Sequence, residues 1–324
     1  MTQTLSTLGL ATINITNLTD GQNKLGILNQ QLATGIKSQK LIDYTSSEAK
    51  LLMDFNNSIS SRKSFLAVIN TISTRLQVYD KSLTGIEKTA AETKTALLSA
   101  GTYNPDQNDT LIKQIQSCMS QVAYYLNQKV GDRYIFSGSR YYTAPVNDIT
   151  LLPSPPSETP PYISSGYAVP AYDADYDPLN PDRAVPQAHV KDSVAIDTTQ
   201  RLTYGITSNE EGFQKLIMGL RWAYAATQDV DNYSSYMSTA SDLITEGLSE
   251  IRGIHANVSG SNSTLEQTKD LHDNLINSIT GQIDDIQKVD VTEVAVKINT
   301  FQAQLEASYA ATARMSSLSL LKYL

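Results

Sequence analysis

The apolar residues at the two ends of the chain repeat with the period of long helices, and this repeat most restricts the possible fold. From Val291 onward they recur at steps of three and four, which places one stripe along a helix and suits a coiled-coil seam. The stripe weakens into small residues near Ser308 and returns as leucines at the end of the chain. The predicted positions of this stripe are Val294, Ile298, Phe301, Leu305, Met315, Leu318, Leu321 and Leu324.

A matching heptad pattern occupies residues 1–36. Only Asp20 and Lys24 are charged in this segment, too few for an ordinary solvated helix face. An amphipathic core helix would explain either stripe alone. Two almost uncharged stripes at opposite ends of a chain instead favour burial against other molecules. The assembly positions predicted in this segment are Leu8, Ala11, Ile15, Leu18, Leu25 and Leu32.

Composition limits the remaining possibilities. The chain has 324 residues, of which 40% are hydrophobic, so it can build real cores. Its net charge of -8 argues against nucleic acid as the main partner, because phosphate contacts need a basic surface. No apolar run is long enough to span a bilayer. The first residues have neither a basic start nor an apolar block, so we expect no cleaved secretory signal.

Before residue 145 the pattern is mostly helical. A stripe from Phe65 to Ile86 continues at steps of three and four. Asn104 and Pro105 are expected to start another helix that ends near Val130 and Gly131. The segment GDRYIFSGSR at 131–140 then predicts a short strand in a hairpin.

The segment 145–200 differs from both of its neighbours. It holds ten of the eleven prolines and contributes -6 to the net charge, so long helices are excluded there. We expect an irregular, solvent-facing insertion with short strands.

After residue 200 the periodic pattern returns. RLTYGIT alternates as a strand does, and Ser208 with Glu211 predicts a capping box at the start of a helix. A further helix is expected over roughly 232–256. Ser263 and Glu266 predict another capping box, which would open the last helical stretch before the terminal stripe.

These segments predict a mainly α-helical fold. It consists of long antiparallel terminal helices and a helical bundle, with a short β-hairpin and an inserted irregular or β lobe. We assign three domains: 1–40 with 288–324 as a terminal coiled coil, 41–144 with 201–287 as a helical rod, and 145–200 as the insertion.

Catalytic and cofactor-binding patterns are missing from the sequence. The run from Asp173 to Asp177 resembles the opening of a calcium loop, but Pro178 replaces the usual glycine and Ala184 the usual glutamate. Cys118 has the spacing of a core residue, and the three histidines are too dispersed for a metal motif. We therefore predict a non-enzyme without catalytic residues, metal or cofactor.

Three segments resemble the flagellin superfamily, and within it the hook-associated protein of the hook–filament junction. GDRYIFSGSRYYTAPV at 131–146 is similar to that family's G-R-Y-[IL]-F-[AS]-G…T-x-P segment. The ending LEASYAATARMSSLSLLKYL resembles its L-Q-A-S-Y…LSL…YL pattern. LATGIKSQKLIDYTSSEA at 32–49 is similar to its N-terminal segment, although Asp43-Tyr44 stands where the family has paired aspartates.

The resemblance implies a structural protein exported to the extracellular flagellum by the flagellar type III apparatus. The terminal helices would stack into an inner tube within a ring of subunits. The implied partners are the preceding hook-associated protein, flagellin and an export chaperone, with no nucleic acid and no membrane span. Two alternatives stay open: a flagellin-type filament subunit, and a cytoplasmic coiled-coil scaffold.

Overall fold

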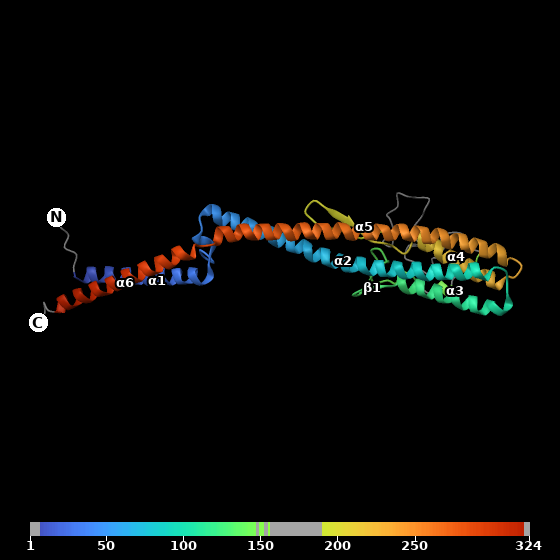
Figure 1. Cartoon of the computed structure of the whole chain (residues 1–324), viewed down its shortest axis with the longest axis horizontal. Coiled ribbons are helices and arrows are strands. Elements are labelled where there is room, and N and C mark those ends of the chain that lie inside the picture. Colours follow the sequence, from blue (N-terminus) through green and yellow to red (C-terminus); the bar gives the residue numbers. More distant parts are fainter. Residues whose placement is uncertain (1–6, 147–148, 152–154, 156–189, 321–324) are drawn as a thin grey trace. The chain divides into compact units, whose positions relative to one another are not determined.

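The computed structural model describes residues 7–146, 149–151, 155 and 190–320. Its helices are α1 (Thr7–Thr34), α2 (Ser46–Ala100), α3 (Pro105–Leu126), α4 (Glu211–Gln228), α5 (Tyr233–Gln287) and α6 (Val291–Leu320), with 3₁₀ turns η1 (Leu41–Asp43) and η2 (Ile149–Leu151). Two antiparallel pairs join β1 (Lys129–Val130) to β2 (Arg133–Tyr134) and β3 (Ser193–Ala195) to β4 (Arg201–Thr203). The prediction of a mainly α fold with a short hairpin is confirmed (Figure 1).

The chain divides into two compact units. The terminal unit comprises Met1–Ser61 with Asn274–Leu324, and the central unit comprises Arg62–Asp273. The proposed three-domain division, with its boundaries at 40, 144, 200 and 288, stays a prediction.

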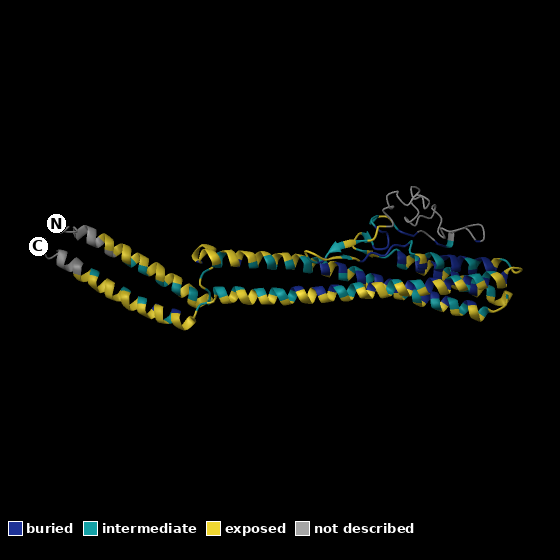
Figure 2. Cartoon of the chain, turned by 90° about the horizontal axis from the view of Figure 1, so that it is seen from above, coloured by how far each residue is buried: buried dark blue, intermediate teal, exposed yellow. Residues whose placement is uncertain are grey.

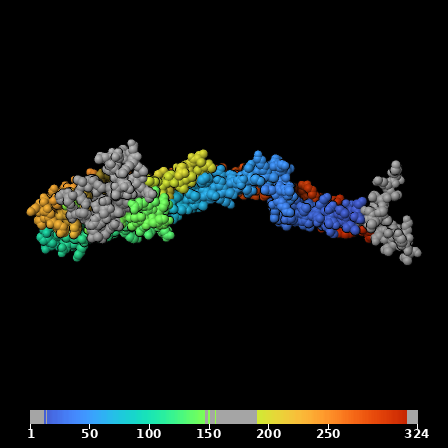
Figure 3. All heavy atoms as spheres, turned by 180° about the vertical axis from the view of Figure 1, so that it is seen from behind, coloured from blue at the N-terminus to red at the C-terminus, as the bar shows by residue number. Residues whose placement is uncertain are grey.

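In the terminal unit, α1 and α6 lie side by side and antiparallel (Figures 1 and 3). Their junction is closed by main-chain bonds: the Lys37 N–H donates to Gln287 O at 2.6 Å, and the Val289 N–H donates to Gly35 O at 3.0 Å. Gly35 ends α1 with a φ of 71°, a left-handed conformation that glycine adopts without a steric cost.

In the central unit, the core lies where α2, α3, α4 and α5 face one another (Figure 2). The stripe predicted on α2 is confirmed, because its apolar positions from Ile69 to Ile86 are buried. The predicted start of α3 is also confirmed: the Asn104 side chain accepts a hydrogen bond from the Asp106 N–H, with Pro105 in the first turn. This helix ends at Leu126, earlier than expected, because the chain there turns into the β1–β2 hairpin through Gly131 (φ 63°).

Two predicted capping boxes are wrong. Helix α4 begins at Glu211, and the Ser208 N–H instead donates to Phe136 O at 2.9 Å. Helix α5 runs without a break through Ser263 and Glu266. The apolar stripe continues across that point through Val258 and Leu265, so burial outweighs the local turn signal.

At the few positions of the insertion that the structure describes, the irregular structure is as predicted, but the solvent-facing character is wrong. Val146, Ile149 and Ile196 are buried in the core, because apolar side chains at both ends of the insertion pack onto the helices. A 3₁₀ turn at Ile149–Leu151 and the strand Ser193–Ala195 are the short, irregular structure expected there. The acidic run from Asp173 to Asp177 lies outside the described residues.

Candidate assembly interface

The α1–α6 pair covers its apolar residues only in part. On α6, Val294 and Ile298 are buried at 4% and 7% exposure, and Phe301 and Leu305 are half-buried. No residue of α1 whose side chain is described is buried (Figure 2). Two helices alone cannot enclose a core, so this unit keeps apolar surface in contact with water.

The positions predicted on α1 differ in how far their side chains are covered. Leu18 and Leu25 are partly covered, whereas Ile15 is 61% exposed and Leu32 is 39% exposed. The side chains of Leu8, Ala11, Met315 and Leu318 lie outside the described part of the chain, as do Leu321 and Leu324. The assembly role of all these positions stays a prediction.

Sequence reasoning missed two residues on the inner side of α1. Gly21 and Leu28 are partly covered, and with Leu18 and Leu25 they complete steps of three and four. A Cβ atom at position 21 would lie 2.7 Å from Cδ2 of Leu305, so glycine permits this close approach. Spacing could have revealed Leu28, but an apolar pattern cannot reveal a glycine.

The segment 131–146, which bears the family resemblance, lies at a junction of the central unit. Tyr79, buried on α2, donates its hydroxyl hydrogen to Ile135 O and accepts from the Ile206 N–H at 3.3 Å. Burial raises the pKa of Tyr79 well above its usual value, so the hydroxyl stays protonated. A single side chain thus ties the 131–146 segment to the chain leading into α4.

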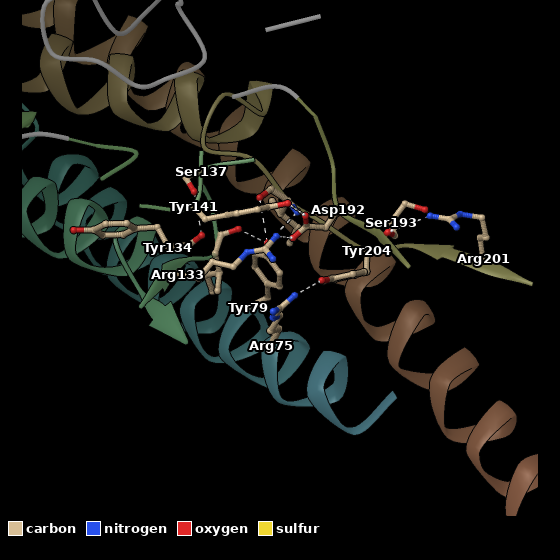
Figure 4. Close-up of polar contacts among 12 residues, drawn as sticks. Arg75, Tyr79, Arg133, Tyr134, Ser137, Tyr141, Asp192, Ser193, Arg201 and Tyr204 are labelled. Atoms are coloured by element: carbon tan, nitrogen blue, oxygen red, sulfur yellow. Dashed lines mark hydrogen bonds and ion pairs between the residues drawn. The ribbon is translucent and has the colours of Figure 1, made fainter. Parts of the chain in front are cut away.

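Polar contacts on the surface of this junction join the same segments (Figure 4). Arg133 pairs with Asp192 and lies over the ring of Tyr141, 3.3 Å from its centroid. The Tyr141 hydroxyl lies 3.3 Å from Asp192, and Arg75 of α2 donates to the Tyr204 hydroxyl at 2.7 Å. These contacts fix both short strand pairs against α2, which is a structural role.

His272 performs a similar function at the other end of the β3–β4 pair. Its Nε2 lies 2.9 Å from Ile196 O and its Nδ1 lies 3.3 Å from Arg62, while its ring stacks on Phe65. A carbonyl only accepts and a guanidinium only donates, so Nε2 carries the hydrogen and Nδ1 accepts. This fully buried histidine is a core residue with both ring nitrogens hydrogen-bonded.

His255 bridges two acidic residues of α2. Its Nδ1 and Nε2 each lie 2.8 Å from a carboxylate oxygen, of Glu87 and Asp80 respectively. Partial burial opposes the charged form, but hydrogen bonds from the imidazolium to the two carboxylates outweigh it and raise the pKa of His255. The imidazolium therefore clamps α5 to α2.

We expect this clamp to make the stability of the protein depend on pH. Since the folded-state pKa is raised above the unfolded value of about 6.5, the stabilisation is full below that value. It is lost as the pH rises through the folded-state pKa. The free energy of unfolding, measured with urea from pH 6 to 9, should fall more for the native chain than for His255→Gln. Parallel curves for the two proteins would contradict this prediction.

Cys118 is a buried core residue, as its spacing predicted. Burial raises the pKa of the Cys118 thiol to about 11, which confirms its core position. Among residues 7–146, 149–151, 155 and 190–320, no group of three His, Cys, Asp or Glu side chains is arranged to hold a metal ion. No helix within the same residues is long and apolar enough to cross a bilayer.

Comparison with known proteins agrees with this geometry. Residues 241–324 match the family described as the bacterial flagellin C-terminal helical region. The fold is similar to that of a putative flagellar hook-associated protein from Vibrio parahaemolyticus, with a TM-score of 0.59 and 13% identity over 74% of this chain and 98% of that one. FlgL of Bacillus cereus has a TM-score of 0.46 and 14% identity over 67% and 98% of the two chains. No curated protein sequence matches.

The fold is therefore of the class seen in a flagellar hook-associated protein, and the C-terminal quarter of the chain matches a flagellin helical region. This likeness concerns the mainly helical fold, with its long helices and two small antiparallel strand pairs.

Proposed function

We propose that this protein is the adaptor that joins the hook-associated proteins to the flagellin filament. The observation that supports assembly is the incompletely covered α1–α6 pair. Its α1 helix leaves Ile13, Ile15 and Ile27 between 45% and 61% exposed, and its α6 helix leaves Val291 and Val296 exposed at 49% and 60%. Neighbouring subunits in a ring would cover these residues.

The choice of an adaptor over a filament subunit rests on the resemblance of 131–146 and of the last twenty residues to the junction family. In this proposal one end of the ring meets the preceding hook-associated protein and the other meets flagellin. Export follows the flagellar type III route, with a chaperone covering the apolar C-terminal helix before secretion. The flagellin-type region at 241–324 keeps a filament subunit as the second candidate.

Deletion of the gene tests the adaptor function. An adaptor lies between two other proteins, so cells without it should keep the hook but release unassembled flagellin into the medium. Electron microscopy and immunoblotting of the culture supernatant would measure both effects, and a copy of the gene supplied on a plasmid should restore attached filaments.

Two results would contradict the proposed adaptor function. Filaments that stay attached in the deletion strain would remove the need for it, and long filaments grown by the purified protein on a seed would favour the flagellin-type subunit. A full-length chain retained inside the cell, with none on purified flagella by immunogold labelling, would favour the cytoplasmic scaffold.

A further inference from the structure

The segment between α1 and α2 displays an apolar tip. Ile42 is 88% exposed and Leu41 is 43% exposed, both in the 3₁₀ turn η1. Neither side chain joins the core of the terminal unit. Leaving two large branched side chains in water is unfavourable, so a flexible loop would tend to fold them inward.

A network of hydrogen bonds prevents that collapse. The buried Tyr44 donates its hydroxyl hydrogen to Ser38 O at 2.6 Å, and the Ser38 hydroxyl donates to Asp43 at 2.6 Å. The Lys40 N–H donates to the Ser38 hydroxyl at 3.0 Å, and the Tyr44 N–H donates to Leu41 O at 3.2 Å. The tip is therefore already ordered in the free subunit, so little conformational entropy of the tip is lost when a partner binds.

A capping box at the start of α2 further restricts the motion of this segment. Thr45 and Glu48 form a capping box: the Glu48 N–H donates to the Thr45 hydroxyl oxygen at 3.3 Å, and the Thr45 N–H donates to Glu48 at 3.1 Å. Glu48 also pairs with Lys37 at 3.3 Å. Hydrogen bonds thus hold the turn at both ends. The two apolar side chains are therefore kept in place for contact with a partner, as they would not be in a flexible linker.

We propose that the Leu41–Ile42 tip docks on the α6 helix of a second copy of this chain, around Ala303, Ala307 and Glu306. This inference rests on the self-assembly within the proposed function. Val296, Ala303 and Ala307 follow one another at steps of seven and four, so they share one face of α6, and all three are exposed. Small residues on that face leave room for the two branched side chains.

Charge complementarity supports this partner. Lys40 precedes the tip and Glu306 adjoins the small residues of α6, and neither forms an ion pair within the described residues. Docking would place the ammonium group of Lys40 opposite the carboxylate of Glu306. The exposed face of α1 is less suitable, because its isoleucines project outward.

The partner must be another copy, because the tip cannot reach this part of its own helix. The Lys37 N–H is bonded to Gln287 O, next to the start of α6, and the closed turn keeps Ile42 near that end. Ala303 lies about 18 Å further along α6. The contact joins two different surfaces, one from each copy. The same contact can therefore be repeated from one subunit to the next, as a ring or a helical array requires.

Cysteine cross-linking of flagella tests this contact. In a Cys118→Ala chain, Ile42→Cys with Ala303→Cys should give dimers and larger species on oxidation, whereas each single variant and the dilute monomer should not. Cross-links of Ile42→Cys with Ile27→Cys, but not with Ala303→Cys, would place the tip on α1 and overturn the proposal. Dimers from Ile42→Cys alone would indicate a symmetric contact and would also overturn it.

Charge exchange gives an independent measurement. Lys40→Glu and Glu306→Lys should each lower the amount of protein on flagella by roughly threefold to tenfold, and the double variant should restore it to within about twofold. Ile42→Asp should lower it by about tenfold or more, while Tyr142→Asp, an 82% exposed control in the central unit, should not. Immunoblots of secreted protein would correct for export.

The two proposals can fail separately. Filaments that stay attached without the gene would remove the adaptor function, whatever the cross-links show. If the adaptor phenotype holds but the Ile42–Ala303 pair gives no cross-link and the charge exchange no rescue, the docking contact is wrong.

Discussion

A chain shortened by Met315–Leu324 is expected to leave the hook without a filament, as the gene deletion does. These ten residues contain the last apolar positions of the terminal stripe, Met315, Leu318, Leu321 and Leu324. Without them the predicted inner helix loses the surface through which we expect neighbouring subunits to pack. Flagellin released into the medium, measured by immunoblotting, should rise to the level of the deletion strain.

The central unit should survive this truncation. Its core is built from α2 to α5, and the removed residues are assigned to the terminal unit. The urea midpoint of that unit should therefore match that of the native chain. A matched control with Ser316→Ala and Ser317→Ala keeps the apolar positions and should hold filaments normally. Attached filaments on the shortened chain would show that the terminal stripe is dispensable for assembly.

A large effect on stability is expected at Gly247, where α5 crosses α4. A Cβ atom there would lie 2.8 Å from both Gly212 O and Leu216 N. Both are main-chain atoms, so the two helices would have to separate. Gly247→Ala should lower the free energy of unfolding by about 2–3 kcal/mol, and Gly247→Val by more.

The same helix offers two controls. A Cβ atom added at Gly253 or Gly260 would meet nothing within 4 Å, so alanine there should stabilise α5 by up to about 1 kcal/mol through helix propensity. Trp222, the only tryptophan, packs on Tyr236 at 4.9 Å between ring centroids and reports directly on the α4–α5 contact. Urea unfolding followed by its fluorescence would measure all three variants. Equal stability of Gly247→Ala and the two controls would contradict the close crossing.

Periodicity predicted the helices well where burial and local signals agree. The stripe of α2 from Ile69 to Ile86 and the cap at Asn104 both follow from short-range spacing and hydrogen bonding. It failed at Ser208 and Ser263, where a capping signal was present but another contact prevailed. The Ser208 N–H bonds a distant carbonyl, and Ser263 lies within a stripe buried on both sides of it.

The sequence by itself determined the helical class, the unusual uncharged ends and the lack of catalytic motifs, because each depends on residue type and near-neighbour spacing. Only the tertiary structure decided which heptad positions face inward, that Gly21 admits Leu305, that Tyr79 joins two distant segments, and that Ile42 stays in solvent. The physical reason is that burial depends on what packs opposite a residue. Here the opposing residues come from parts of the chain that spacing along the sequence does not connect.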